Sequence, residues 1–348
     1  MKNKIYLTAV LLLTGLMILK GEEAILYAKD AMYICANMII PSLFPFFICS
    51  GLLIYSGFCQ TLSKIFAPVM KPLFNVNPNG SSAFVLGIIS GYPLGAVTAC
   101  QLYESRYISK SETERLLAFC NNSGPLFLLG SVGIGLYMGL NIGIILYCAH
   151  VLGALLVGVC MRFYSSQKHS APDYILETEE ISFGEAFKNS ATNAINNMLL
   201  VCATIIFFSV ASRLFLGLIP YELPPFIYGL FEFSSGNAMI AASGIPLGLK
   251  LVTASIITGF AGLSVHMQVL AVCARHELSM KPYILGKIMH GIFSGSITAI
   301  ILRFTDYVPV FTTSASPTSV AFVMASLYTI ICIGSIGILI LLLQLKKA

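Results

Sequence analysis

Long apolar runs separated by short polar segments dominate this chain of 348 residues. A run of about 20 apolar residues is long enough for a helix to cross a hydrocarbon core of about 30 Å. The first run contains Lys2 and Lys4 but lacks a small-residue cleavage site, so we expect a retained span rather than a signal peptide. The pattern predicts about eight spans, at 1–20, 32–57, a broken run through 121–125 to 135, 140–164, 193–216, 249–274, 283–304 and 320–345.

Four apolar stretches are interrupted by residues that end or bend helices: G-I-I-S-G-Y-P-L-G at 87–95, F-C-N-N-S-G-P at 119–125, F-E-F-S-S-G-N at 231–237 and G-F-A-G-L-S at 259–264. In lipid, each unpaired N–H or C=O group costs several kcal/mol, so broken backbone persists only where it is buried in protein or lines a wet cavity. The apolar arms around 87–95 hold roughly ten residues each, too few to span a bilayer. They favour a re-entrant helical hairpin, and 231–237 predicts a second one.

An internal repeat supports this division of the chain. The segments I-L-Y-C-A-H-V-L-G-A-L and L-G-K-I-M-H-G-I-F-S-G place His150 and His290 140 residues apart, and at this offset 122–124 falls on 262–264. Each half therefore predicts a span, a hairpin, a broken span and a span. The expected units are an N-terminal span and external loop at 1–30, a first repeat at 31–164, a cytoplasmic linker at 165–183, a second repeat at 184–305 and a C-terminal span at 306–348.

The distribution of basic residues predicts how the chain is oriented. Because cytoplasmic loops are rich in Lys and Arg, we expect both termini and the polar loop at 165–182 to be cytoplasmic. The segment 305–319 contains no Lys or Arg and is expected on the other side, whereas Arg213 and Lys250 fall there against the rule. The two halves then have opposite topology, which is typical of alternating-access carriers. The predicted fold is an all-α polytopic membrane protein of about eight transmembrane helices plus two re-entrant hairpins in two inverted-topology repeats.

Composition narrows the function further. With 57% hydrophobic and 10% charged residues, the chain differs from soluble domains, which carry about 25% charged residues. The net charge of +5 is spread over loops, so no nucleic-acid partner is expected. The ten Cys include no C-x-x-C pair, and we infer no disulfide, metal or redox role for them. No catalytic triad, H-E-x-x-H motif or phosphate loop is present, so we expect neither an enzyme nor a cofactor.

The first hairpin tip and the first helix break are the leading solute-binding candidates. Asn and Ser side chains there offer donors and acceptors, and Pro125 is suited to the first position of the resumed helix, whose N-terminus favours a carboxylate. Tyr92 offers a ring for stacking. The alternative is that these side chains only satisfy backbone groups freed by the breaks. The candidates are Ser90, Gly91, Tyr92, Asn121, Asn122, Ser123 and Gly124.

The second half adds an acid and further polar residues. Glu232 is the only acid within the second hairpin, and an ionisable group in a membrane indicates a functional site. We expect it to bind a coupling cation or proton; the alternative is solvation at the interface near Glu222. Ser264 and Gln268 are four residues apart, hence on one helix face. The proposed neighbours are Ser234, Ser235 and Asn237. For His150 and His290, an interhelical hydrogen bond and proton transfer both stay open.

Four motifs resemble the nucleoside-recognition (Gate) domain family, and within it the YlbJ (SpoVV) family of sporulation integral membrane proteins. They are G-I-I-S-G-Y-P-L-G-A, S-E-T-E-R-L-L-A-F-C-N-N-S-G-P, G-L-F-E-F-S-S-G and G-F-A-G-L-S-V-H-M-Q, and the resemblance covers about 31–304. The stretch L-L-A-F-C-N-N-S-G-P is the more specific one. The resemblance implies a distant relation to concentrative nucleoside carriers. It also implies a role in endospore formation, with movement of dipicolinate across the outer forespore membrane.

These observations together predict a carrier of a small planar anion. The resemblance makes dipicolinate the first expected solute; the alternatives are a nucleoside transporter and a membrane scaffold for spore assembly that transports nothing. A scaffold has no need of two pairs of broken helices, whereas a carrier has. The expected partners are the anionic solute, the lipid bilayer and a coupling proton or cation; whether the chain forms an oligomer stays open. Both termini are expected in the cytoplasm.

Overall fold

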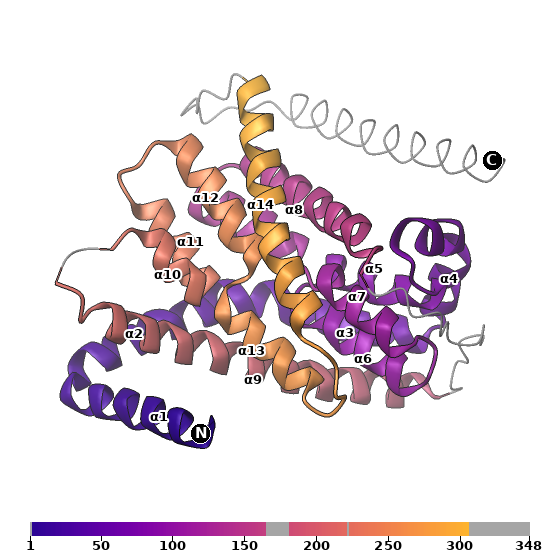
Figure 1. The fold of residues 1–348 in the computed structure, drawn as a ribbon, viewed down its shortest axis with the longest axis horizontal. Coiled ribbons are helices and arrows are strands. Elements are labelled where there is room, and N and C mark those ends of the chain that lie inside the picture. Colours follow the sequence, from indigo (N-terminus) through magenta and orange to yellow (C-terminus); the bar gives the residue numbers. More distant parts are fainter. Residues whose placement is uncertain (1, 165–180, 221–222, 306–348) are drawn as a thin grey trace.

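The computed structural model describes residues 2–164, 181–220 and 223–305, and all regular structure within these ranges is helical (Figure 1). The first elements are α1 (Lys2–Leu19), α2 (Gly21–Ile34), η1 (Cys35–Ile39), α3 (Ile40–Tyr55), α4 (Phe58–Val69), η2 (Met70–Phe74), η3 (Pro78–Gly80), α5 (Ser81–Ser90), α6 (Leu94–Glu104) and α7 (Lys110–Cys120). The remaining ones are η4 (Leu126–Leu136), α8 (Leu140–Met161), α9 (Phe183–Leu216), α10 (Pro225–Phe231), α11 (Phe233–Ala242), α12 (Leu247–Phe260), α13 (Gly262–Cys273) and α14 (Lys281–Phe304).

Several of these helices are long and apolar enough to cross a membrane. In the described ranges there are 5 such segments, at Gly21–Tyr55, Leu140–Met161, Phe183–Leu216, Leu247–Cys273 and Lys281–Phe304. The prediction of an all-helical membrane protein is thus confirmed for these residues. The predicted C-terminal span at 320–345 and most of the linker at 165–183 lie outside them.

Two helices begin earlier than the hydropathy pattern predicts. Residues 21–30, expected as an external loop, form the start of α2, where Glu22 and Glu23 lie in the first turn and favour the positive end of the helix dipole. Helix α9 begins at Phe183 instead of 193, and the hydroxyl of Ser182 accepts a hydrogen bond from the backbone N–H of Glu185. Both extensions are polar, so they carry no hydropathy signal although they are compatible with helix.

The four predicted interruptions all occur in the structure. Helices α5 and α6 contact each other and are joined by 91–93, where Gly91 has φ +89° and so requires glycine or strain. Helix α7, capped by Ser109 and Glu112, stops at Cys120 before η4 begins. In the second half, Glu232 separates α10 from α11, and Ala261, with φ 73°, separates α12 from α13.

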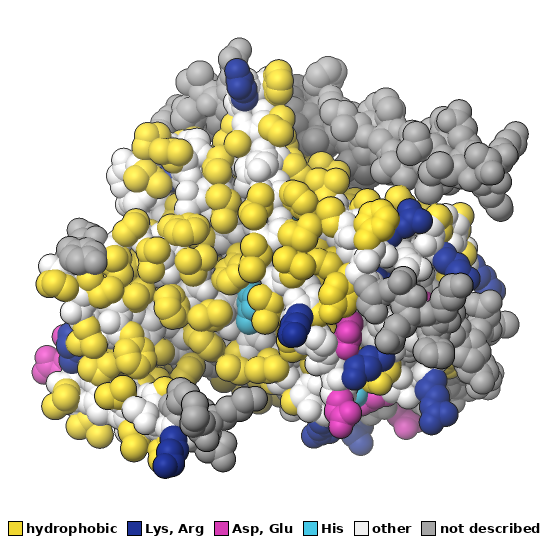
Figure 2. Space-filling model, in the orientation of Figure 1, with side chains coloured by type: hydrophobic (Ala, Val, Ile, Leu, Met, Phe, Trp, Pro, Cys, Tyr) yellow, Lys and Arg dark blue, Asp and Glu magenta, His cyan; other side chains and the backbone are white. Residues whose placement is uncertain are grey.

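Helix α14 lies at the centre of the described helices and contacts α7, α8 and α12 (Figure 1). Glycines allow this: a Cβ at Gly286 would lie 2.6 Å from the carbonyl oxygen of Ala118, and one at Gly259 2.8 Å from the Cα of Gly291. Such close backbone approach through small residues is how helices associate where lipid provides no hydrophobic driving force. Figure 2 shows mostly hydrophobic side chains on the face formed by α12–α14, with charged ones mainly toward the lower edge.

Candidate functional site

The buried face of α14 is polar, and its outer face is apolar. The exposed positions include Ile284, Ile288 and Ile292, at helical spacing. This distribution is the reverse of that in a soluble protein, whose helices turn their apolar stripe inward. The inward stripe is almost completely inaccessible to solvent and consists of Lys287, His290, Ser294 and Thr298.

Lys287 is the functional candidate that the sequence analysis did not identify. Its ammonium group donates to the backbone oxygen of Asn121 at 2.5 Å and to Nδ1 of His290 at 3.3 Å, and lies 5.1 Å from the centroid of the Tyr92 ring. The side chain is 0% exposed, and no carboxylate of the described residues forms an ion pair with it. The signal was present in the sequence, since a lysine inside the predicted span 283–304 indicates function by the same rule as Glu232.

Two histidines whose rings contact each other at a tilt hold the first helix break. The rings of His150, on α8, and His290 are 4.3 Å apart between centroids. Nε2 of His290 contacts the backbone oxygen of His150 at 2.8 Å, which assigns the proton to that nitrogen, while Nε2 of His150 accepts the N–H of Ser123 at 2.9 Å. An interhelical hydrogen bond, one of the two alternatives left open for this pair, is therefore present. His150 and Lys287 together satisfy backbone groups of residues 121 and 123, as burial in lipid demands.

The side chains of the first break play different parts. The amide of Asn122 donates to the backbone oxygen of Phe119 at 2.8 Å, so it satisfies a backbone group freed by the break, which was the alternative to solute binding. Its Oδ1 has no hydrogen-bond partner among the described residues. Asn121 is also completely buried. At the adjacent hairpin tip, Gly91 approaches so closely that a Cβ on it would lie 3.0 Å from the nitrogen of Gly124. The hairpin tip and the helix break thus form one polar centre.

Glu232 caps helix α11 instead of facing solvent. Its carboxylate accepts the backbone N–H groups of Ser234 at 3.0 Å and Ser235 at 2.6 Å. The residue is 1% exposed, so the alternative of a solvated interface is wrong for this acid. Charge-assisted bonds at a helix N-terminus are a strong stabilisation of a buried carboxylate. The carboxylate is therefore held by the backbone of its own hairpin, whereas the sequence analysis expected a coupling cation or proton there.

The other predicted residues of the second half are buried as well. Ser264 and Gln268 share a buried face of α13, as their spacing predicts; the Gln268 amide nitrogen donates to Oγ1 of Thr204 at 2.8 Å. Asn237 donates to Oγ1 of Thr258 at 3.1 Å. The Oγ of Ser264 and Oε1 of Gln268 have no hydrogen-bond partner among the described residues. Two predicted serines bond to neighbouring helices instead, Ser90 to Ser50 on α3 and Ser235 to Ser209 on α9.

One small cavity brings together predicted residues from both halves of the chain. Its volume is about 20 Å³, room for one water molecule and far below the volume of a ring-sized solute. Apolar residues such as Ile39 and Phe233 complete its wall. The sequence-predicted residues that line it are Tyr92, Ser123, Gly124, Ser234 and Gln268.

An aromatic cluster closes this cavity. The rings of Tyr92 and Phe127 contact that of Phe233 edge to face, with centroids 5.6 and 5.4 Å apart. The hydroxyl of Tyr92 donates to the backbone oxygen of Thr258 at 2.9 Å, which ties the first hairpin tip to α12. Ring contacts and one hydrogen bond therefore join residues of the two halves of the chain beside the cavity.

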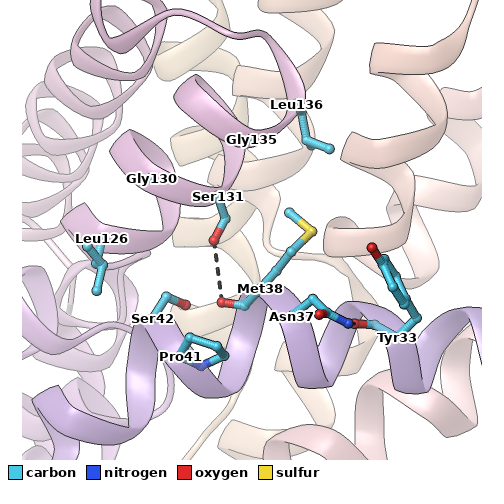
Figure 3. A pocket seen from close by; sticks show the side chains of 10 residues that line it. All are labelled: Tyr33, Asn37, Met38, Pro41, Ser42, Leu126, Gly130, Ser131, Gly135 and Leu136. Atoms are coloured by element: carbon cyan, nitrogen blue, oxygen red, sulfur yellow. Dashed lines mark hydrogen bonds between the residues drawn. The ribbon is translucent and has the colours of Figure 1, made fainter.

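A larger cleft lies next to the cavity, between α2–α3 and η4 (Figure 3). It encloses about 520 Å³, and the hydroxyl of Ser131 donates to the backbone oxygen of Met38 across it at 3.4 Å. The cleft residues Met38, Ser42 and Leu126 are the chain neighbours of cavity residues 39, 43 and 127. The cleft and the cavity are therefore lined in part by the same helices.

Comparison with known proteins agrees with these features. Residues 36–140, which include the first hairpin and the first break, match the Gate family model described as nucleoside recognition. Over 330 residues the chain is 29% identical to the sporulation integral membrane protein YlbJ of Bacillus subtilis (strain 168), covering 84% of this chain and 81% of that protein. No solved structure matches the chain. The resemblance inferred from the four motifs is confirmed.

Proposed function

We propose that this chain, a membrane protein with a Gate domain, is a carrier of a small planar anion that acts in sporulation. The observation that carries the proposal is the small closed cavity between the two halves of the chain, lined by Ser123 from one helix break and by Ser234 and Gln268 from the other half. Discontinuous helices that meet around a solute site are the architecture of secondary transporters. A scaffold would gain nothing from buried polar atoms that lack a hydrogen-bond partner among the described residues, such as Oε1 of Gln268.

The first solute we propose is dipicolinate, a pyridine ring with two carboxylates, moved across the outer forespore membrane. The similarity to a sporulation membrane protein supports the setting. The second candidate is a nucleoside, because the matched family model is described as nucleoside recognition. The two differ in charge, and the site contains a buried lysine beside the cavity wall. That lysine favours the anion.

The test is solute uptake by purified protein in liposomes, with dipicolinate and uridine compared under proton and cation gradients. We expect dipicolinate uptake that depends on one of these gradients, through ion binding at Glu232. Glu232→Gln keeps the size and one acceptor oxygen but removes the titrating charge, so uptake should continue without gradient dependence. Uptake of uridine alone would favour the nucleoside candidate, and uptake of neither would favour a scaffold. Unchanged gradient dependence in the Gln variant would leave Glu232 with only its capping role.

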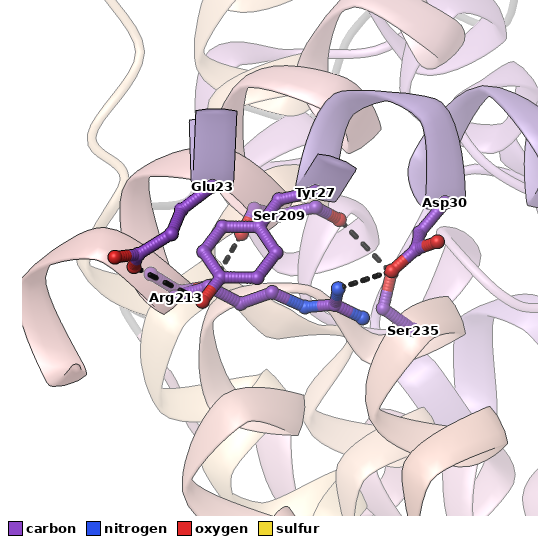
Figure 4. Close-up of polar contacts among 7 residues, drawn as sticks. Glu23, Tyr27, Asp30, Ser209, Arg213 and Ser235 are labelled. Atoms are coloured by element: carbon purple, nitrogen blue, oxygen red, sulfur yellow. Dashed lines mark hydrogen bonds and ion pairs between the residues drawn. The ribbon is translucent and has the colours of Figure 1, made fainter. Parts of the chain in front are cut away.

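We also propose that the two halves are inverted repeats with about eight spans, both termini and the 165–182 loop being cytoplasmic. Arg213 and Lys250 are the residues that the basic-loop rule leaves on the wrong side. The guanidinium of Arg213 pairs with Asp30 at 2.6 Å and lies 5.1 Å from the ring centroid of Tyr27 (Figure 4). Lys250, the other exception, donates to the backbone oxygen of Ala241 at 2.7 Å.

Cysteine labelling decides the orientation. A single cysteine introduced at Ser170 of a variant lacking the native cysteines should react with a membrane-impermeant maleimide only after the cytoplasmic face is exposed, because the loop is expected inside. A cysteine introduced at Ser314 should react from the external face. The opposite pattern would contradict the inverted-repeat arrangement, and both sites are polar loop positions in the sequence, so protein stability is not at issue.

A further inference from the structure

Lys287 places a basic side chain where the described residues provide no negative charge. Its Nζ contacts the carbonyl of Asn121, the imidazole of His290 and the face of the Tyr92 ring, none of which carries a negative charge. The buried acid of the second hairpin, Glu232, directs its carboxylate to the backbone of 234 and 235. Burying an ammonium group without a counter-ion is expensive, and in membrane proteins such groups mark solute or ion pathways.

The Tyr92 ring separates this charge from the cavity. The ammonium of Lys287 lies over the ring, while the ring itself lines the cavity beside Ser123 and contacts Phe233. A hydrogen bond from its hydroxyl to Thr258 and the contact with Phe233 hold it in this position. Rotation of the ring away from Lys287 would therefore open the cavity to the ammonium group.

We propose that Lys287 is the counter-charge for a carboxylate of the transported solute, and that Tyr92 covers it when no solute is bound. The proposal rests on the proposed function and adds the chemistry of recognition: an aromatic carboxylate replaces the Tyr92 ring over the ammonium. The first break would supply further contacts, since the backbone at 121 and 123 is already fixed by Lys287 and His150. Preference for an anion over an uncharged ring of the same shape then depends on one residue.

The experiment measures a selectivity ratio in liposomes. Dipicolinate and its uncharged diamide are offered to wild-type protein, to Lys287→Gln and to Lys287→Met. A charged hydrogen bond contributes about 1.5–3 kcal/mol, so we expect the dipicolinate-to-diamide ratio to fall roughly 10- to 100-fold in both variants. The ratio does not depend on how much protein folds. Lys250→Gln is the matched control, because Lys250 also donates to a backbone oxygen on an apolar helix but lies away from the cavity; its ratio should not change.

A ratio in Lys287→Gln and Lys287→Met equal to that of the wild type overturns the proposal and leaves the carrier function standing. If wild-type protein transports no dipicolinate, the proposed function fails. The role of Lys287 is then tested by dipicolinate binding instead of transport. Dipicolinate should then raise the unfolding temperature of the wild type but not of the variants, because a ligand stabilises only the protein that binds it. Absence of this shift in the wild type, or the same shift in the variants, overturns the anion site.

Discussion

Gly87→Ala is expected to destabilise the protein by about 3 kcal/mol or more, enough to prevent recovery of folded protein from the membrane. A Cβ on Gly87 would overlap the backbone oxygen of Cys120, the last residue of α7. Gly95, on the other arm of the hairpin, meets the same oxygen. The obstacle is backbone on both sides, so no side-chain rotation relieves it. The measurement is the fraction of monodisperse protein after heating in detergent, by size-exclusion chromatography.

Gly130→Ala is the matched control for this prediction. Gly130 also lies in a helix of an apolar stretch, but a Cβ there would have its nearest neighbour, Cδ1 of Leu126, at 3.7 Å, an ordinary contact. We expect this variant to be as stable as the wild type or slightly more so, since alanine favours helix over glycine by about 1 kcal/mol. Equal stability of the two variants would mean that the hairpin does not seat against Cys120 as described.

Oxidation of Cys100 and Cys273 to a disulfide is expected to stop transport completely. Their sulfur atoms are 3.5 Å apart, one on α6 of the first hairpin and the other at the end of α13 in the second half. Copper phenanthroline accepts the two electrons, and the two thiols release two protons as the S–S bond forms. The bond cross-links α6 to α13, which an alternating-access cycle would move apart. Uptake in liposomes should fall to background after oxidation and return after dithiothreitol.

Cys100→Ser removes one sulfur and should make transport resistant to the oxidant, which excludes effects of the other cysteines. Mass spectrometry of the oxidised wild type identifies the 100–273 cross-link. Full transport by protein that carries this cross-link would show that α6 and α13 move as one body, and the boundary between the moving parts would then lie elsewhere.

The small volume of the cavity bears on both proposed solutes. A cavity of about 20 Å³ holds neither dipicolinate nor a nucleoside, so either solute requires the ring cluster of Tyr92, Phe127 and Phe233 to separate. The cluster joins residues of both halves, and in the proposed mechanism its opening would expose Lys287 in the same movement. Access to the site and the appearance of its charge are therefore coupled by the fold.

Much of the fold was predictable because the bilayer imposes local requirements. Span length and apolar composition are properties of single segments, and they predict helices such as α8 and α14 within a few residues. The breaks at 121–124 and 261 were visible because Gly, Pro, Asn and Ser disfavour continuous helix in an apolar run. The polar starts of α2 and α9 were missed, since a helix stabilised by caps and charge pairing leaves no trace in hydropathy.

The sequence by itself determined the membrane class, the interrupted helices and the polar residues at the interruptions, because each depends on neighbours along the chain. Only the tertiary structure decided what these residues do. In the structure the Glu232 carboxylate accepts backbone N–H groups of α11, and Nε2 of His150 accepts the N–H of Ser123. Lys287 donates to the backbone oxygen of Asn121, 166 residues away in the sequence. Such contacts arise from close helix crossings at positions such as Gly286 and Gly291. Crossing geometry depends on the shapes of both partners at once, which no single stretch of sequence contains.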